Sequence, residues 1–255
     1  MPGRRRRHAV RKAPVAKNAN FHIGTSGYEY NHWRGVFYPK ELPHRDWFGH
    51  YAEAFDTVEI NNTFYSLPEG ETFDAWRDRA PQRFLYALKF SRYGSHLKHL
   101  KNPKETIGLF IKRAERLGPH LGPILVQLPP QWNADAERLD AFLDAAPPNH
   151  LWAVEFRNPS WLGEPIYDVL RRHRAALCLH DLIEDHPEVQ TTGWIYRRFH
   201  GAGKGGAYSH QALTAAAQRI KANLADGADV FAYFNNDAQG FAVDNARALK
   251  RYVLG

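Results

Sequence analysis

Eight short runs of β-branched and aromatic residues, separated by longer segments of helical character, constrain the fold of this 255-residue chain most. The predicted strands are Phe21–Thr25, Thr57–Asn61, Phe84–Phe90, Pro123–Leu128, Leu151–Phe156, Ala176–Asp181, Trp194–His200 and Val230–Asn235. Strands that alternate with helices are parallel and are joined by right-handed crossovers. The alternation therefore predicts an α/β protein, a single (β/α)8 TIM barrel over residues 21–255.

An open, doubly wound sheet is the alternative arrangement of these elements. It would carry a glycine-rich turn after the first strand, but Gly24-Thr25-Ser26-Gly27 lacks the GxGxxG spacing. Helix signals also fit the barrel. Asn102 and Ser209 are predicted N-caps, Gly118-Pro119 ends the first of these two helices, and residues 237–252 are predicted to form the closing helix.

The basic charge of the chain is concentrated in its first twenty residues. The formal net charge is +7, and residues 1–20 contain seven of the 34 Lys and Arg but no Asp or Glu. The 27 remaining cations equal the 27 Asp and Glu, so the body is formally neutral. We expect residues 1–20 to be a disordered tail, either a nucleic-acid-contacting arm or an extension without a specific role.

The single cysteine and the lack of a long apolar segment indicate where in the cell the protein is found. Cys178 is the one cysteine, so no internal disulfide can form, and it lies in an apolar run typical of packing. No stretch approaches the ~18 apolar residues of a membrane span, and no apolar segment follows the arginines as in a secretory signal. We predict a cytoplasmic protein without a membrane partner.

Polar side chains gather where the predicted strands end, which is where TIM barrels place their reacting groups. The candidate catalytic residues are Glu59, Glu155, His180, Asp181 and His200. The candidate substrate-binding residues are Thr25, Ser26, Tyr28, Asn61, Lys89, Arg92, Gln127, Arg157, Arg198, Asn235 and Asn236. Each also has a structural interpretation: Glu155 and Arg157 can form a local ion pair, and His180 can be a hydrogen-bonded core histidine.

These motifs resemble the domain-of-unknown-function family 72, also called the YecE-like family, from His22 to Leu249. The resemblance is carried by Gly24-Thr25-Ser26-Gly27-Tyr28 with Trp33 and Phe37-Tyr38-Pro39; Val58-Glu59-Ile60-Asn61 with Thr63-Phe64-Tyr65; Lys89 with Ser91-Arg92 and His96; Gln127-Leu128-Pro129-Pro130; Glu155-Phe156-Arg157 with Ser160-Trp161; Arg198 and His200-Gly201; and Phe234-Asn235-Asn236 with Ala242 and Asn245-Ala246. The resemblance implies a TIM barrel and no particular reaction. The Arg-rich tail is outside the shared pattern.

Our first functional hypothesis is an enzyme that applies acid–base chemistry to a small anionic or phosphorylated substrate. Lys89, Arg92, Arg157 and Arg198 would bind the anion, because guanidinium and ammonium groups suit phosphate and carboxylate. The glycine-rich loop 200–206 follows the seventh strand, where many barrels bind phosphate. For acid–base work the candidates are the two glutamates with His180 or His200. On this hypothesis Glu155→Gln removes activity with little change in thermal midpoint, whereas a collapse of folding would mark a buried Glu155–Arg157 pair.

Two alternatives stay open. A metal-dependent hydrolase, such as a phosphodiesterase or an endonuclease-IV-like barrel, would use Glu59, Glu155, Asp181 and His200 as ligands for a divalent metal. Dense ligand motifs such as HxH are absent, and arginines on the same strands would repel a cation, so we predict no cofactor outside this alternative. The second alternative is a non-catalytic protein that binds nucleic acid or a small ligand, although the neutral body argues against extended phosphate contacts.

Overall fold

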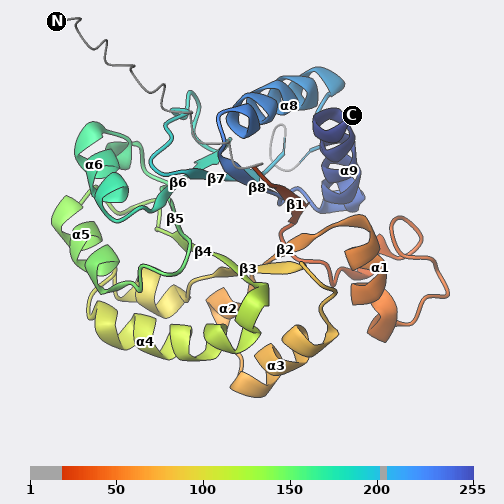
Figure 1. Cartoon of the computed structure of the whole chain (residues 1–255), viewed down its shortest axis with the longest axis horizontal. Helices are drawn as coiled ribbons and strands as arrows, with labels where there is room; N and C mark the ends of the chain where they lie inside the picture. The colour runs from red at the N-terminus through yellow and green to blue at the C-terminus, as the bar shows by residue number, and fades with distance from the viewer. Residues whose placement is uncertain (1–18, 202–205) are drawn as a thin grey trace, which may run out of the picture.

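The computed structural model describes residues 19–201 and 206–255, and its centre is a ring of eight parallel strands (Figure 1). The strands are β1 (Phe21–Thr25), β2 (Thr57–Ile60), β3 (Leu85–Lys89), β4 (Leu121–Gln127), β5 (Trp152–Glu155), β6 (Ala176–His180), β7 (Trp194–Phe199) and β8 (Asp229–Phe234). Their order is β1-β8-β7-β6-β5-β4-β3-β2. All eight predicted strands are confirmed, with ends within two residues, and so is the TIM-like barrel.

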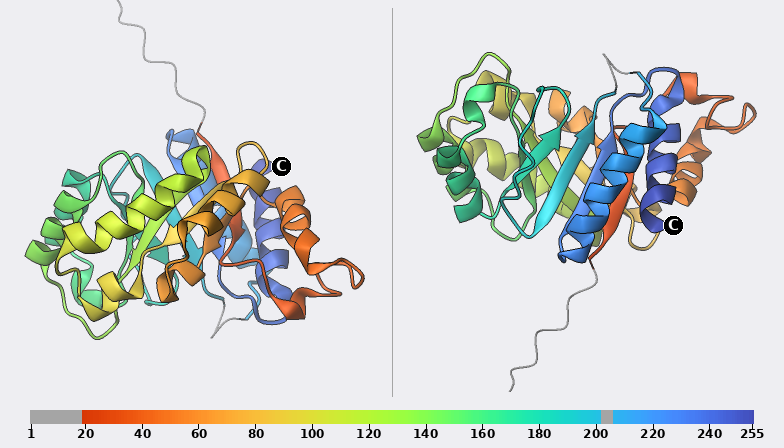
Figure 2. Two further views of the ribbon diagram at one scale, coloured as in Figure 1. Left: turned by 90° about the horizontal axis from the view of Figure 1, so that it is seen from below. Right: turned by 90° about the horizontal axis from the view of Figure 1, so that it is seen from above.

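Helices cover the outside of the ring, as Figures 1 and 2 show. They are α1 (Trp47–Ala54), α2 (Asn62–Tyr65), α3 (Gly70–Arg79), α4 (Pro103–Ala114), α5 (Ala136–Ala145), α6 (Glu164–Arg172), α8 (His210–Ala225) and α9 (Phe241–Leu254). Within the described residues, no helix combines the length and the apolar character needed to cross a membrane.

The ring is nearly closed, and its seam lies between β1 and β2. These two strands share one bridge, between Ser26 and Glu59, and Gly27 N–H donates to the Glu59 carbonyl at 2.8 Å. A Cβ on Gly24 would lie 2.0 Å from the carbonyl oxygen of Thr57. Glycine is therefore required at position 24 for the strands to approach so closely.

The connection from β6 to β7 departs from the predicted alternation of strands and helices. Residues 181–193, all of them described, contain no helix. Thr191 holds this segment against β6, since its hydroxyl accepts from Leu177 N–H at 2.9 Å and donates to the Ala175 carbonyl at 2.7 Å. A hollow of about 390 Å³ lies between the segment and α8. Arg197, on the outer face of β7, lines the hollow and forms an ion pair with Glu188.

Three predicted boundaries are corrected or confirmed by hydrogen bonds. Ser209 caps α8 as predicted, because its side chain accepts from Ala212 N–H. Asn102 is in the left-handed region and its side chain caps nothing, so the predicted cap of α4 is wrong. The closing helix begins at Phe241, because a 3-10 turn over 238–240 precedes it.

Asn20, which the sequence predicts as the last residue of a disordered tail, is bonded to β8. Asn20 accepts from Val230 N–H at 2.8 Å, and its own N–H donates to the Asp229 carboxylate at 2.6 Å. Residue 20 therefore continues the pairing of β1 with β8. The predictions for residues 1–18 and for the loop positions 202–205 lie outside the described residues.

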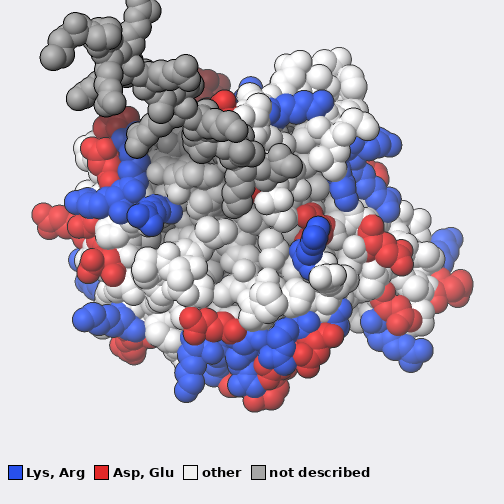
Figure 3. All heavy atoms as spheres, in the orientation of Figure 1, with Lys and Arg blue, Asp and Glu red and all other residues white. Residues whose placement is uncertain are grey.

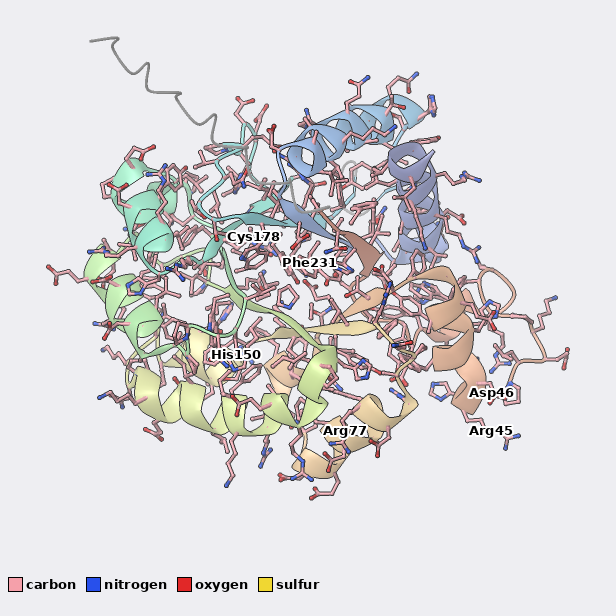
Figure 4. All side chains as sticks on the ribbon, in the orientation of Figure 1. Arg45, Asp46, Arg77, His150, Cys178 and Phe231 are labelled. Atoms are coloured by element: carbon pink, nitrogen blue, oxygen red, sulfur yellow. The ribbon has the colours of Figure 1, made fainter. Side chains whose placement is uncertain are left out.

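Alternate residues of each strand fill the interior of the barrel. Figure 4 shows Cys178 and Phe231 inside the ring, while Arg45 and Arg77 lie at the periphery. Tyr196 and Tyr233 pack beside Cys178 in the same buried cluster. With its middle filled by apolar side chains and tyrosines, the barrel can present polar groups only at the strand ends.

Charges on the outside are mixed in sign. Figure 3 views the molecule from the N-terminal ends of the strands, and its Lys and Arg side chains lie among Asp and Glu. On α3, for example, Asp74 pairs with both Arg77 and Arg116. This surface agrees with a formally neutral body.

Candidate active site

A buried ion-pair network crosses the barrel at the C-terminal ends of three strands. Glu59 on β2, Glu155 on β5 and Arg198 on β7 are each 0–1% exposed. Arg198 donates from Nη1 to Glu155 at 2.6 Å and from Nη2 to Glu59 at 2.7 Å. The guanidinium thereby joins two carboxylates from opposite sides of the ring, which compensates three charges that would be costly to bury alone.

Further donors occupy the remaining carboxylate oxygens. Glu59 accepts from the hydroxyls of Ser26 and Tyr196, each at 2.6 Å. Burial alone would raise the pKa of the Glu59 carboxyl, but Arg198 and these two hydroxyls lower it below its ordinary value.

Glu155 is compensated in the same way. It accepts from Gln127 Nε2 at 2.8 Å and from Arg157 Nε. Burial opposes ionisation, yet Arg198 and Arg157 bring the pKa of Glu155 well below its usual value. The predicted pairing of Glu155 with Arg157 is confirmed, and both glutamates are ionised at neutral pH.

Lys89, on β3, lies beside this network without a carboxylate of its own. Its Nζ is 4.3 Å from the centroid of the Phe64 ring, and the residue is 8% exposed. Among the described residues, no carboxylate forms an ion pair with it. Burial first, and then the charge of Arg198, lower the pKa of Lys89 to about 8.

His200 and Asp181 form a pair at the ends of β7 and β6. Asp181 accepts from the backbone N–H of His200 at 3.0 Å and from its Nδ1 at 3.2 Å. Since a carboxylate only accepts and a guanidinium only donates, Nδ1 carries the hydrogen and Nε2 accepts a long bond from Arg157 Nη2, at 3.4 Å. Burial alone would raise the pKa of Asp181, but hydrogen bonds from His200 and Tyr208 outweigh burial and lower it below its ordinary value, so Asp181 is ionised. This arrangement orients His200 as a proton acceptor or donor.

His180 has a different environment. Its Nε2 donates to the Phe156 carbonyl at 2.7 Å, and its Nδ1 accepts from Leu182 N–H at 3.2 Å. Both ring nitrogens are therefore occupied by backbone groups, and burial lowers the pKa of His180 to about 4. The predicted alternative of a hydrogen-bonded core histidine describes this geometry.

The remaining candidates lie around the ring and not in one pocket. Thr25 donates to the Gly27 carbonyl at 2.6 Å, and the Tyr28 hydroxyl accepts from Arg79. Asn236 donates to the Gly206 carbonyl at 3.0 Å. The half-buried Asn61 lines a hollow of about 170 Å³ with Tyr28, Tyr30 and Trp76. Arg92 is exposed, and Asn235 is half-buried and donates its backbone N–H to Phe199.

The donor set does not suit a divalent metal. Across residues 19–201 and 206–255, no three His, Cys, Asp or Glu side chains are grouped so that they could hold an ion. Of the four predicted ligands, Glu59 and Glu155 are already bonded to Arg198. Arginine donors occupy the positions where a metal would bind these carboxylates.

Some residues of the network were not predicted. Tyr196 donates to Glu59, Tyr208 donates to Asp181, and His96 packs edge-on against Phe64 at 5.0 Å. Tyr196 could have been found, because it stands two residues before Arg198 on one strand face. Tyr208 is 27 positions from Asp181 in the sequence, so no local pattern indicates their contact.

Comparison with known proteins agrees with this architecture. Residues 22–254 match the family model described as "Protein of unknown function DUF72". The chain belongs to the DUF72 family. Among its members, the UPF0759 protein YecE of Escherichia coli (strain K12) is 31% identical over 115 residues, which are 45% of this chain and 42% of YecE. The matched segment thus spans less than half of that relative.

Two other DUF72 members match over most of their length. The UPF0759 protein YunF of Bacillus subtilis (strain 168) is 25% identical over 78% of this chain and 83% of YunF. The crystal structure of a DUF72 family protein from Thermotoga maritima superposes with a TM-score of 0.84 and 27% identity, covering 92% of this chain and all of that one. A DUF72 family protein from Enterococcus faecalis, at 18% identity and a TM-score of 0.76, shares the fold.

Proposed function

We propose that this DUF72 protein is an enzyme that binds a small anionic substrate at the C-terminal ends of its strands and moves a proton by general acid–base chemistry. The observation that supports this proposal is the charge imbalance of the buried network. Three cations, Lys89, Arg157 and Arg198, face two carboxylates, Glu59 and Glu155. A third carboxylate, Asp181, is bonded instead to His200 and Tyr208 and forms no ion pair with these cations. The excess positive charge lies on Lys89 and Arg157, where the low dielectric strengthens its attraction for an anion.

In this proposal the two glutamates act as counter-charges and not as the acid or base. Every carboxylate oxygen of Glu59 and Glu155 already accepts a hydrogen bond, and neither side chain is exposed. His200 takes the role of base, because Asp181 fixes its Nδ1–H and its Nε2 keeps a lone pair whose present bond, from Arg157, is long at 3.4 Å and can be exchanged for the substrate's proton. Arg157, 23% exposed, places the anion next to that nitrogen.

The anion-binding part is tested with inorganic phosphate as the probe. Phosphate at ten times its dissociation constant adds about 1.4 kcal/mol, which raises the Tm by roughly 3–5 °C for a domain of this size. Lys89→Met should remove most of this rise. Lys112→Met, on the exposed surface of α4, is the matched control and should keep it. Equal shifts in all three proteins would contradict the assignment.

The proton-transfer part is tested in the same preparations. Exchange of the methyl hydrogens of pyruvate in D2O reports removal of a proton next to a carbonyl. We expect His200→Asn to slow this exchange by about 100-fold or more, the usual contribution of a positioned base, while the phosphate-induced rise in Tm persists. Exchange that is as fast in His200→Asn as in the wild type would exclude His200 as the base.

A further inference from the structure

We propose that Lys89 forms an imine with the carbonyl carbon of an anionic keto compound, of which a 2-oxo acid is the simplest class. This inference rests on the proposed function, because the anion-binding groups would hold the carboxylate of such a compound. To the proposed function it adds a covalent step, the imine at Lys89, and a class of substrate, the 2-oxo acids.

The position of Lys89 supports a chemical role. Lys89 is the last residue of β3 and shares the inner face of the strand with Ala87. Its Nζ lies over the Phe64 ring, and the charges of Glu59, Arg198 and Glu155 are close enough to act on it. Thr63 holds its backbone, donating to the Lys89 carbonyl at 2.8 Å. Lys89 is 8% exposed, and no carboxylate of the described residues forms an ion pair with its amine.

The charges around Lys89 favour the neutral amine. Burial and Arg198 are the largest influences and Arg157 adds to them, whereas Glu155 and Glu59 act in the opposite direction. With a pKa of about 8, roughly a tenth of the Lys89 amines are neutral at pH 7, against fewer than about one in a thousand for an ordinary lysine. A desolvated lysine beside other cations is the form in which proteins use this residue as a nucleophile.

The step balances without an outside reactant. The neutral amine adds to the carbonyl carbon, and its two hydrogens leave with the carbonyl oxygen as one water molecule. A C=N double bond replaces the C=O double bond, and nothing is oxidised or reduced. The guanidinium of Arg157 would attract the carboxylate of the keto acid. This would hold the carbonyl carbon of the keto acid near Nζ of Lys89.

The experiment traps the imine in the full-length protein. Protein is incubated with pyruvate and sodium cyanoborohydride, which reduces C=N bonds to stable amines, and the labelled lysine is found by peptide mass mapping. We expect one reduced pyruvate per chain, on Lys89, in roughly tenfold excess over any other lysine. Label distributed evenly over the lysines would overturn the proposal.

Three variants make the test specific. Lys89→Arg keeps the positive charge but cannot form an imine, so it should lose the label while retaining the phosphate-induced rise in Tm. Lys89→Met should lose both. Lys98→Met removes a lysine whose Nζ lies 5.2 Å from the Tyr93 ring, an aromatic neighbour like that of Lys89, and should keep both.

The outcomes separate this inference from the function on which it rests. If pyruvate and phosphate raise the Tm through Lys89 but no label forms, the imine is excluded and the anion site stands. If label forms on Lys89 without any rise in Tm, the imine stands and the anion-binding role is excluded. A melting transition recorded for each variant shows that it is folded.

Discussion

At the scale of single residues, the buried charged groups at the strand ends fall into two sets: those that form ion pairs with one another and those that keep a nitrogen free of carboxylates. Glu59, Glu155 and Arg198 satisfy one another and are shielded from solvent. Lys89 and His200 each keep a nitrogen that no carboxylate occupies. Glu59, Glu155 and Arg198 thus neutralise one another, and Lys89 and His200 are the side chains that we propose to react.

Glu155→Gln should lower the free energy of unfolding by about 3–5 kcal/mol, because it leaves Arg157 without its partner and Arg198 with one carboxylate instead of two. This replaces the expectation from sequence that the variant would fold normally. Urea denaturation measures the change. Glu164→Gln, which disrupts an exposed pair with Arg171, is the control and should change stability by less than about 1 kcal/mol. Similar small losses in both variants would show that the buried network contributes little.

The pairings of the site could not be predicted from the sequence, although its members could. Alternation along a strand indicates that Glu155 and Arg157 share a face, and that pair is present. The bond of Arg198 to Glu59 joins residues 139 positions apart, and it depends on the register of strands across the ring. His180 looked like a catalytic group because local sequence does not reveal that backbone atoms occupy both of its nitrogens.

At the scale of elements, the sequence predicts the strands of this barrel better than it predicts the segments that connect them. All eight strands follow from short apolar runs, because burial on both faces imposes this composition. The 181–193 connection was wrongly expected to contain a helix like its neighbours. Pro187, in the middle of the segment, disfavours a helix there, and the overall alternation of strands and helices was given more weight than this signal. The place of this segment beside β6 depends on Thr191, whose two hydrogen bonds are long-range.

The two predicted caps provide a matched comparison. Ser209→Ala should destabilise the protein by about 1 kcal/mol, because Ser209 accepts from Ala212 N–H at the start of α8. Asn102→Ala removes no capping bond, so it should lack this cost, although the left-handed backbone at Asn102 disfavours alanine slightly. Asn102→Gly avoids that backbone penalty and is the better control. Thermal unfolding of the three variants is the measurement, and equal losses in Ser209→Ala and Asn102→Gly would contradict this assignment.

At the scale of the whole molecule, buried neutral histidine makes stability depend on pH. The pKa of His180 is about 4 in the folded protein and about 6.5 when unfolded, so between these values the unfolded chain binds more protons. Stability should therefore fall as the pH falls, by about 2 kcal/mol from pH 7 to pH 5 for this residue alone. Glu59 and Glu155 have lowered pKa values in the folded protein, so they stabilise it fully at any pH above the pKa of an unfolded glutamate. Their contribution to stability is lost only at pH values below that pKa.

Urea denaturation at pH 7 and at pH 5 checks this dependence. His180→Gln can still bond to the backbone but cannot be protonated, so it should lose less stability between the two pH values than the wild type. Burial also lowers the pKa of His96 to about 4, and this adds a loss in the same direction to both proteins. Identical losses in wild type and variant would show that His180 accepts a proton inside the folded protein.

The seam at β1 has a consequence for the chain during its synthesis. β1 has a full ladder only with β8, and Asn20 bonds to Asp229 across 209 positions. A ribosome that adds 5–20 residues per second needs about 10–40 s to make the chain between them. Until β8 has been made, the first strand lacks the partner of its ladder, and an unpaired strand edge can pair with other strands. The first strand made is thus completed by the last strand made, so the barrel cannot close before the end of synthesis.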